Sequence, residues 1–124
     1  FAVVHAGWRG LAAGVVDAAF AAFRGPVEWA VLGPSIGACC YEFGAADLEL
    51  VARGVHADPA GIAGVTALGT PALDVARAVG AACGHHGVEI EAVGGCTGCT
   101  FDGFSHRTRG ELGRHVVVAW RAAA

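Results

Sequence analysis

Short apolar runs alternate with helix-period segments along the 124-residue chain, and this alternation is what most constrains its fold. Short, continuous apolar runs are typical of buried strands, and segments with a 3.6-residue apolar period are typical of covered helices. Strands and helices that alternate in this way pack as layers. The sequence therefore predicts an α/β (α+β) fold, with α/β/α layers around a mixed sheet.

Individual elements follow from apolar spacing and from turn residues. Thr70 and Pro71 have the residue types of a helix N-cap and first helical position, and this pair predicts a helix to residue 83. We expect loops over 56–69 and 94–113, where no period is visible. The other expected elements are helices over 10–23 and 45–53, strands over 1–4, 27–32, 88–93 and 114–120, and a short extended segment over 39–43.

Composition excludes several classes of protein. Hydrophobic residues make up 55% of the chain and charged residues 15%, which excludes intrinsic disorder. Eight basic residues against 11 acidic ones exclude nucleic-acid binding by bulk charge. The most apolar stretch, 11–23, carries Asp17 and is shorter than the roughly 20 residues of a membrane span. Five cysteines, two of them adjacent, do not form a disulfide framework, so we expect a cytoplasmic protein without membrane association.

The densest candidate site is His5-Ala6-Gly7-Trp8-Arg9-Gly10, where a predicted strand ends and a helix begins. Ligands of α/β proteins bind at the carboxyl ends of strands, and helix N-termini attract anions. Arg9 adds a planar bidentate donor, and His5 is a metal ligand or a proton carrier. The alternative is a core histidine and a surface ion pair.

A second candidate site covers residues 33–42, which include Gly33, Ser35, Gly37, Cys39 and Cys40. Its glycines permit close backbone approach, so it could form the wall of a pocket with Ser35 as a polar contact. It lacks the lysine of a Walker loop. For the two cysteines, burial by packing is the favoured interpretation.

Two further clusters follow in the last third of the chain. Cys96-Thr97-Gly98-Cys99 has metal or redox spacing, but the sequence shows no second pair of this kind, and packing is favoured. Residues 105–114 form a basic segment with three arginines, which could bind phosphate, with a solvated loop as the alternative.

In this order the clusters resemble the YfiH-like family, also called multicopper polyphenol oxidases or laccase-domain proteins. The resemblance assigns residues 1–124 to the C-terminal part of a single, incomplete domain. The matching segments are Val4-His5-Ala6-Gly7-Trp8-Arg9-Gly10, Gly33-Pro34-Ser35-Ile36-Gly37-Ala38-Cys39-Cys40-Tyr41-Glu42, Leu73-Asp74-Val75, Cys96-Thr97, Phe104-Ser105-His106-Arg107 and Gly113-Arg114.

This resemblance implies a zinc-dependent purine nucleoside phosphorylase that acts on adenosine, inosine and methylthioadenosine and also deaminates adenosine. Its expected partners are a purine nucleoside and phosphate, and homodimer formation stays open. One alternative is a peptidoglycan-editing hydrolase that acts on a cell-wall precursor. Another is an inactive fragment that needs its N-terminal half.

The resemblance also implies roles for individual residues. The family's zinc is held by two histidines and a cysteine, of which only His5 maps here, and the other two ligands are expected upstream. Copper is less expected, because multicopper chemistry needs paired histidines. At Gly103 the sequence departs from the family, whose members carry an aromatic residue there. The expected catalytic residues are Arg9, Ser105 and Arg107, and the expected substrate-binding residues are Gly7, Arg9, Ser35, Gly37 and Arg107.

Overall fold

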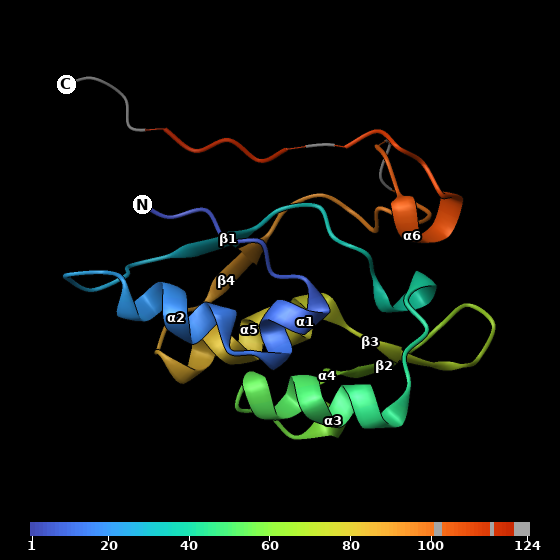
Figure 1. Ribbon diagram of the computed structural model, residues 1–124, viewed down its shortest axis with the longest axis horizontal. Coiled ribbons are helices and arrows are strands. Elements are labelled where there is room, and N and C mark those ends of the chain that lie inside the picture. Colours follow the sequence, from blue (N-terminus) through green and yellow to red (C-terminus); the bar gives the residue numbers. More distant parts are fainter. Residues whose placement is uncertain (101–102, 115, 121–124) are drawn as a thin grey trace.

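Short helices and strands alternate along the chain, as the computed structural model shows for residues 1–100, 103–114 and 116–120 (Figure 1). The mixed α/β class is therefore confirmed. In chain order the elements are α1 (Trp8–Ala12), α2 (Val15–Ala21), β1 (Ala30–Leu32), the 3-10 helix η1 (Ala38–Cys40), α3 (Ala45–Gly54), α4 (Pro59–Ile62), β2 (Ala63–Val65), β3 (Pro71–Leu73), α5 (Val75–His85), β4 (Ile90–Ala92) and α6 (His106–Arg109).

Parallel and antiparallel pairings are divided between two small sheets within the described residues. β1 and β4 pair in parallel, with Ala30 opposite Ile90 and Leu32 opposite Ala92. β2 and β3 pair antiparallel, with Ala63 opposite Leu73. The parallel pair matters for function, because it brings the segments that follow β1 and β4 to the same edge.

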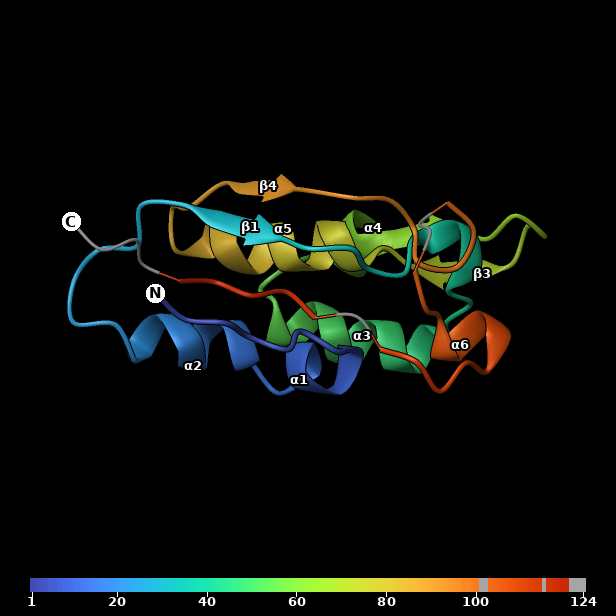
Figure 2. The same cartoon turned by 90° about the horizontal axis from the view of Figure 1, so that it is seen from above.

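Helix α5 lies between the β1–β4 pair and α3, as both views show (Figures 1 and 2). Its buried face consists of Val75, Ala78, Val79, Ala82 and Cys83. The largest fully buried side chains come from other elements that pack around it: Leu11, Val51, Val55, Ile62 and Leu73. None of the described helices has the length and apolar character needed to cross a membrane.

The predicted helix over 10–23 is two helices, α1 and α2. Gly14 interrupts it with a φ of 74°, in the left-handed region that glycine adopts readily. The first helix also begins earlier than expected, at Trp8, with Gly7 as its N-cap.

The predicted helix start at Thr70 and Pro71 is wrong. Pro71 lies in β3, and α5 begins only at Val75, where the Asp74 side chain accepts a hydrogen bond of 3.0 Å from the Arg77 N–H. The Thr70 hydroxyl instead bonds to Thr66 and Glu42. Aspartate is the stronger cap, and cross-strand pairing holds residues 71–73 extended.

Other predicted boundaries also change. Residues 39 and 40, at the start of the segment predicted to be extended over 39–43, belong to the 3-10 helix η1, and the predicted loops contain α4, β2 and α6. The predicted strands over 1–4 and 114–120 are wrong for their described residues, which pair with no described strand and are largely exposed. Helix α3 confirms the prediction over 45–53.

Candidate functional site

A hollow of about 170 Å³ lies beyond the carboxyl ends of β1 and β4. Ser35 follows β1 and Cys96 follows β4, and these two residues continue the parallel pairing as a single bridge. The Thr97 N–H donates to the Ser35 carbonyl at 2.9 Å. Ligands usually bind at this edge of a parallel strand pair. Here the edge is built from the candidate site over residues 33–42 and from the Cys96–Cys99 segment.

Ser35 and Gly37, both predicted to bind substrate, line this hollow. The Gly37 N–H donates to the Cys96 sulfur at 3.1 Å. A Cβ on Gly37 would lie 3.2 Å from the Cβ of Cys96, so a larger residue would push the two segments apart. Gly37 therefore permits close backbone approach here, and its contact with substrate stays a prediction.

Four cysteines meet beside the hollow, although the sequence favoured simple packing for them. The Sγ atoms of Cys39, Cys40, Cys96 and Cys99, here called the cysteine cluster, all lie within 4.8 Å of one another, which is close enough for one metal ion such as zinc. Cys39 and Cys99 are exposed, so packing does not account for them. All five described cysteines are free thiols.

Hydrogen bonds and burial shift the thiol pKa values of the cysteine cluster in opposite directions. The contact with Cys99 raises the pKa of Cys39 to about 12, and burial raises the pKa of Cys40 to about 11. Burial acts to raise the pKa of Cys96, but the hydrogen bonds to its sulfur, led by those from the N–H groups of Gly37 and Gly98, together lower the value to about 7. Backbone hydrogen bonding therefore favours the thiolate form of Cys96.

Arg9 and Arg107, predicted to bind phosphate, approach one group of aromatic rings from distant parts of the chain. Trp8 packs edge-on against Phe43 at 5.4 Å, and Phe43 against Tyr41 at 5.3 Å. The Arg9 guanidinium carbon lies 4.5 Å from the Trp8 ring centroid, and that of Arg107 lies 5.2 Å from the Tyr41 centroid. The rings thus connect the two arginines.

The charges of both arginines reach Tyr41. Burial raises the pKa of the Tyr41 phenol, and the positive charges of Arg107 and Arg9 oppose that shift. Within the described residues, neither guanidinium forms a salt bridge. Both are exposed, so they offer positive charge and bidentate donors to an anion.

The predicted metal ligand His5 is exposed and lies in the segment before α1. Its Nε2 would be 3.0 Å from a Cβ on Gly7, so Gly7 makes room for the imidazole. In the part of the chain that the structure describes, the cysteine cluster is the only grouping of three or more metal-binding side chains. The described residues therefore do not complete a zinc site around His5.

Ser105 has a structural use. Its buried hydroxyl caps α6 by accepting hydrogen bonds from the Thr108 hydroxyl at 2.7 Å and the Thr108 N–H at 3.5 Å. Arg109, from the same basic segment, forms a salt bridge with Glu111 and donates to the carbonyls of Thr97 and Gly98. The predicted catalytic role of Ser105 stays a prediction.

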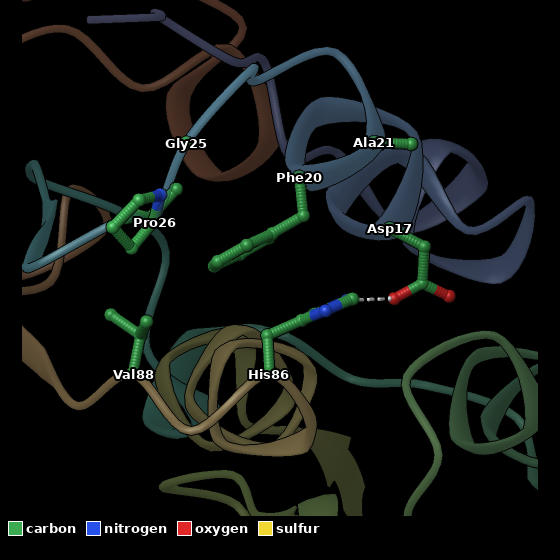
Figure 3. Close-up of a pocket in the computed structure, with 8 residues that line it drawn as sticks. Asp17, Phe20, Ala21, Gly25, Pro26, His86 and Val88 are labelled. Carbon is green, nitrogen blue, oxygen red and sulfur yellow. Dashed lines mark hydrogen bonds and ion pairs between the residues drawn. The ribbon is translucent and has the colours of Figure 1, made fainter.

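A second hollow, of about 370 Å³, lies between α2 and the end of α5 (Figure 3). Asp17 accepts hydrogen bonds from His56 at 2.7 Å and from His86 at 2.8 Å. His86 also stacks on Phe20 at 4.1 Å between centroids. The sequence assigned no role to these histidines, and the structure shows them joining the ends of three helices.

Comparisons with known proteins agree with the sequence motifs. The family described as multi-copper polyphenol oxidoreductase laccase matches residues 1–122. A purine nucleoside phosphorylase of Pseudomonas aeruginosa is 34% identical over 96% of this chain and 51% of its own length. One of Streptomyces coelicolor is 38% identical over 96% of this chain and 50% of its own length. The chain thus spans about half the length of these relatives. No solved structure matches it.

Proposed function

Because the chain belongs to the multi-copper polyphenol oxidoreductase laccase family, the YfiH-like family of the sequence motifs, we propose that it forms part of a purine nucleoside phosphorylase. Two relatives that carry this name, at 34% and 38% identity, support the proposal. The substrates proposed are adenosine, inosine and methylthioadenosine, together with phosphate. We place the activity in the cytoplasm, where cysteine thiols stay reduced.

Convergence of Arg9 and Arg107 on the Trp8–Phe43–Tyr41 group is the observation that carries this proposal. Guanidinium groups bind phosphate through paired N–H donors, and neither Arg9 nor Arg107 has a carboxylate partner among the described residues. Five residues are too few for α1 to provide an anion site at its N-terminus, so the arginine side chains have to supply the binding.

In the reaction, a phosphate oxygen attacks C1′ of the ribose while the bond from C1′ to the purine nitrogen breaks. The bonding electron pair leaves with the base, which then takes up a proton. Arg9 and Arg107 orient the phosphate and balance its charge, and Ser35 bonds to the sugar or the base from the hollow beyond β1 and β4. Tyr41 directly follows Cys40 in the chain, and Cys96 of the same cysteine cluster lines that hollow.

Zinc bound at His5 would supply a Lewis acid or an activated water. His5 is the ligand that this chain contributes to such a site, and its exposed imidazole suits that role. Deamination of adenosine requires an activated water, so we propose that activity only for protein in which His5 has further ligands.

The test measures phosphate-dependent release of hypoxanthine from inosine. We expect Arg9→Ala and Arg107→Ala each to raise the KM for phosphate by about 10- to 100-fold, the cost of losing a charged hydrogen-bond partner. Arg53→Ala, at the exposed end of α3, is the matched control and should change nothing. Unchanged phosphate dependence in both variants would contradict the proposal, and release of an amino acid from a muramyl peptide would favour the editing hydrolase.

A further inference from the structure

We propose that the cysteine cluster binds one Zn²⁺ ion in a closed tetrahedral site that is separate from His5. The four sulfurs already lie within 4.8 Å of one another, and Cys39 and Cys99 approach to 3.5 Å. Zinc with four thiolate ligands holds its sulfurs about 3.8 Å apart. Each sulfur therefore needs to move by about 1 Å or less to bind the ion.

The backbone around the cluster is arranged as in a metal site. The N–H groups of Gly37 and Gly98 both donate to the Cys96 sulfur, at 3.1 and 3.3 Å. Such bonds orient a thiolate ligand and offset its charge. A Cβ on Gly98 would lie 2.8 Å from the Cβ of Cys40 and 2.9 Å from its sulfur, so only glycine lets the two segments meet.

The number of sulfurs distinguishes a metal site from the other roles of cysteine. A disulfide would use two of the four, whereas all four converge here. Four thiolates fill every position of tetrahedral Zn²⁺ and leave none for water or substrate, which is typical of a structural site. On binding, the thiols release protons to solvent as the sulfur–zinc bonds form.

The ion would join two segments that the chain separates widely. One is η1, directly followed by Tyr41, and the other is the loop over 96–99. Arg109 extends the connection to α6 by donating to the carbonyls of Thr97 and Gly98 at 3.3 and 3.0 Å. The zinc would thereby fix Arg107 of α6 against Tyr41. The importance of this last consequence for phosphate binding rests on the proposed function. Zinc binding by the four cysteines does not.

Zinc content per chain is the direct test, measured by elemental analysis of protein purified in a reducing, zinc-containing buffer. We expect one ion per chain, and Co²⁺ in its place should give the charge-transfer and ligand-field bands of a four-thiolate tetrahedral site. Cys99→Ser should weaken zinc binding at least tenfold. His5→Ala and Cys83→Ala are the controls, because neither residue belongs to the cluster, and both should keep the ion.

A second measurement needs no variant. Hydrogen exchange of residues 96–100 and 103–110 should slow when zinc is returned to chelator-treated wild-type chain. The proposal is overturned if zinc is lost in His5→Ala but kept in Cys99→Ser. It is equally overturned if the reduced wild-type chain holds no zinc, or if its exchange does not respond to the metal. If the wild-type chain binds zinc but shows no phosphate-dependent release of hypoxanthine from inosine, the proposed function fails and the zinc site stands.

Discussion

At the scale of single residues, Gly54 marks the closest approach between two helices. It is the last residue of α3, and a Cβ there would fall on the carbonyl oxygens of Leu11 and Ala12, the latter at 2.6 Å. These are backbone atoms, which cannot rotate away as a flexible side chain would. The absence of a side chain at position 54 therefore sets the distance between α1 and α3.

We expect Gly54→Ala to lower the free energy of unfolding by about 1–3 kcal/mol or more, the usual cost of overpacking. Gly84→Ala is the matched control, since it lies in α5 with nothing within 4 Å of its added Cβ. That change should raise stability by about 0.5–1 kcal/mol, because alanine loses less conformational freedom in a helix. Urea denaturation of both variants measures the two free energies of unfolding. Equal changes in the two variants would contradict the close packing of Gly54 against α1.

At the scale of elements, Asp17 of α2 joins the ends of α3 and α5. It bonds to His56, just beyond α3, and to His86, just beyond α5. His85 stacks on His56 with centroids 3.8 Å apart and adds an aromatic contact to the same junction. Polar groups at these helix ends thus add to the buried contacts that α2, α3 and α5 already share in the core.

The pH dependence of this junction follows from the pKa of Asp17. Hydrogen bonds from His56 and His86 lower that pKa below its usual 3.8. A carboxyl with a depressed folded-state pKa stabilises the protein above its unfolded pKa, and the contribution is lost as pH falls through the folded pKa. Because the Asp17 side chain is 35% exposed, solvent screening limits the contribution to about 1 kcal/mol or less.

Asp17→Asn should therefore destabilise the chain at pH 6 by about 0.5–1 kcal/mol, and this deficit should shrink as the pH falls below 3.8 towards pH 3. Thermal unfolding at the two pH values measures this. Glu49→Gln, an exposed carboxylate of α3, is the control and should behave like wild type at both. A deficit of the same size at both pH values would show that packing, and not the charge, is responsible.

At the scale of the whole molecule, the core and the exposed apolar surface are separate. Leu11, Val51, Val55, Ile62 and Leu73 are fully buried where α1, α3, α4, β3 and α5 meet. Large apolar side chains are exposed at Phe1, Val3, Val116, Val118 and Trp120. Figure 1 shows these two end segments on the β1 side of the molecule, away from α3.

Two leucines locate the core by experiment. Leu73→Ala should lower the free energy of unfolding by about 2–5 kcal/mol, because Leu73 is fully buried. Leu112→Ala should change it by less than about 0.5 kcal/mol, because Leu112 is 86% exposed. Denaturant midpoints give both values, and a comparable loss in the two variants would mean that the segment around Leu112 is packed.

By itself the sequence determined the mixed α/β class, helix α3, most of α5 and the approximate places of β1 and β4. These depend on local periodicity and turn residues, which act over a few positions. It missed the break at Gly14 and the shift from Thr70 to Asp74, because each required weighing one local preference against another.

Only the tertiary structure decided which distant residues meet. The parallel β1–β4 pairing places the adjacent cysteines beside the Cys96–Cys99 pair, and it removes the objection that the sequence offers no second pair. The aromatic group likewise brings Arg107 to the region of Arg9. Contacts between residues so far apart in the chain depend on strand pairing and core packing, which no local pattern encodes.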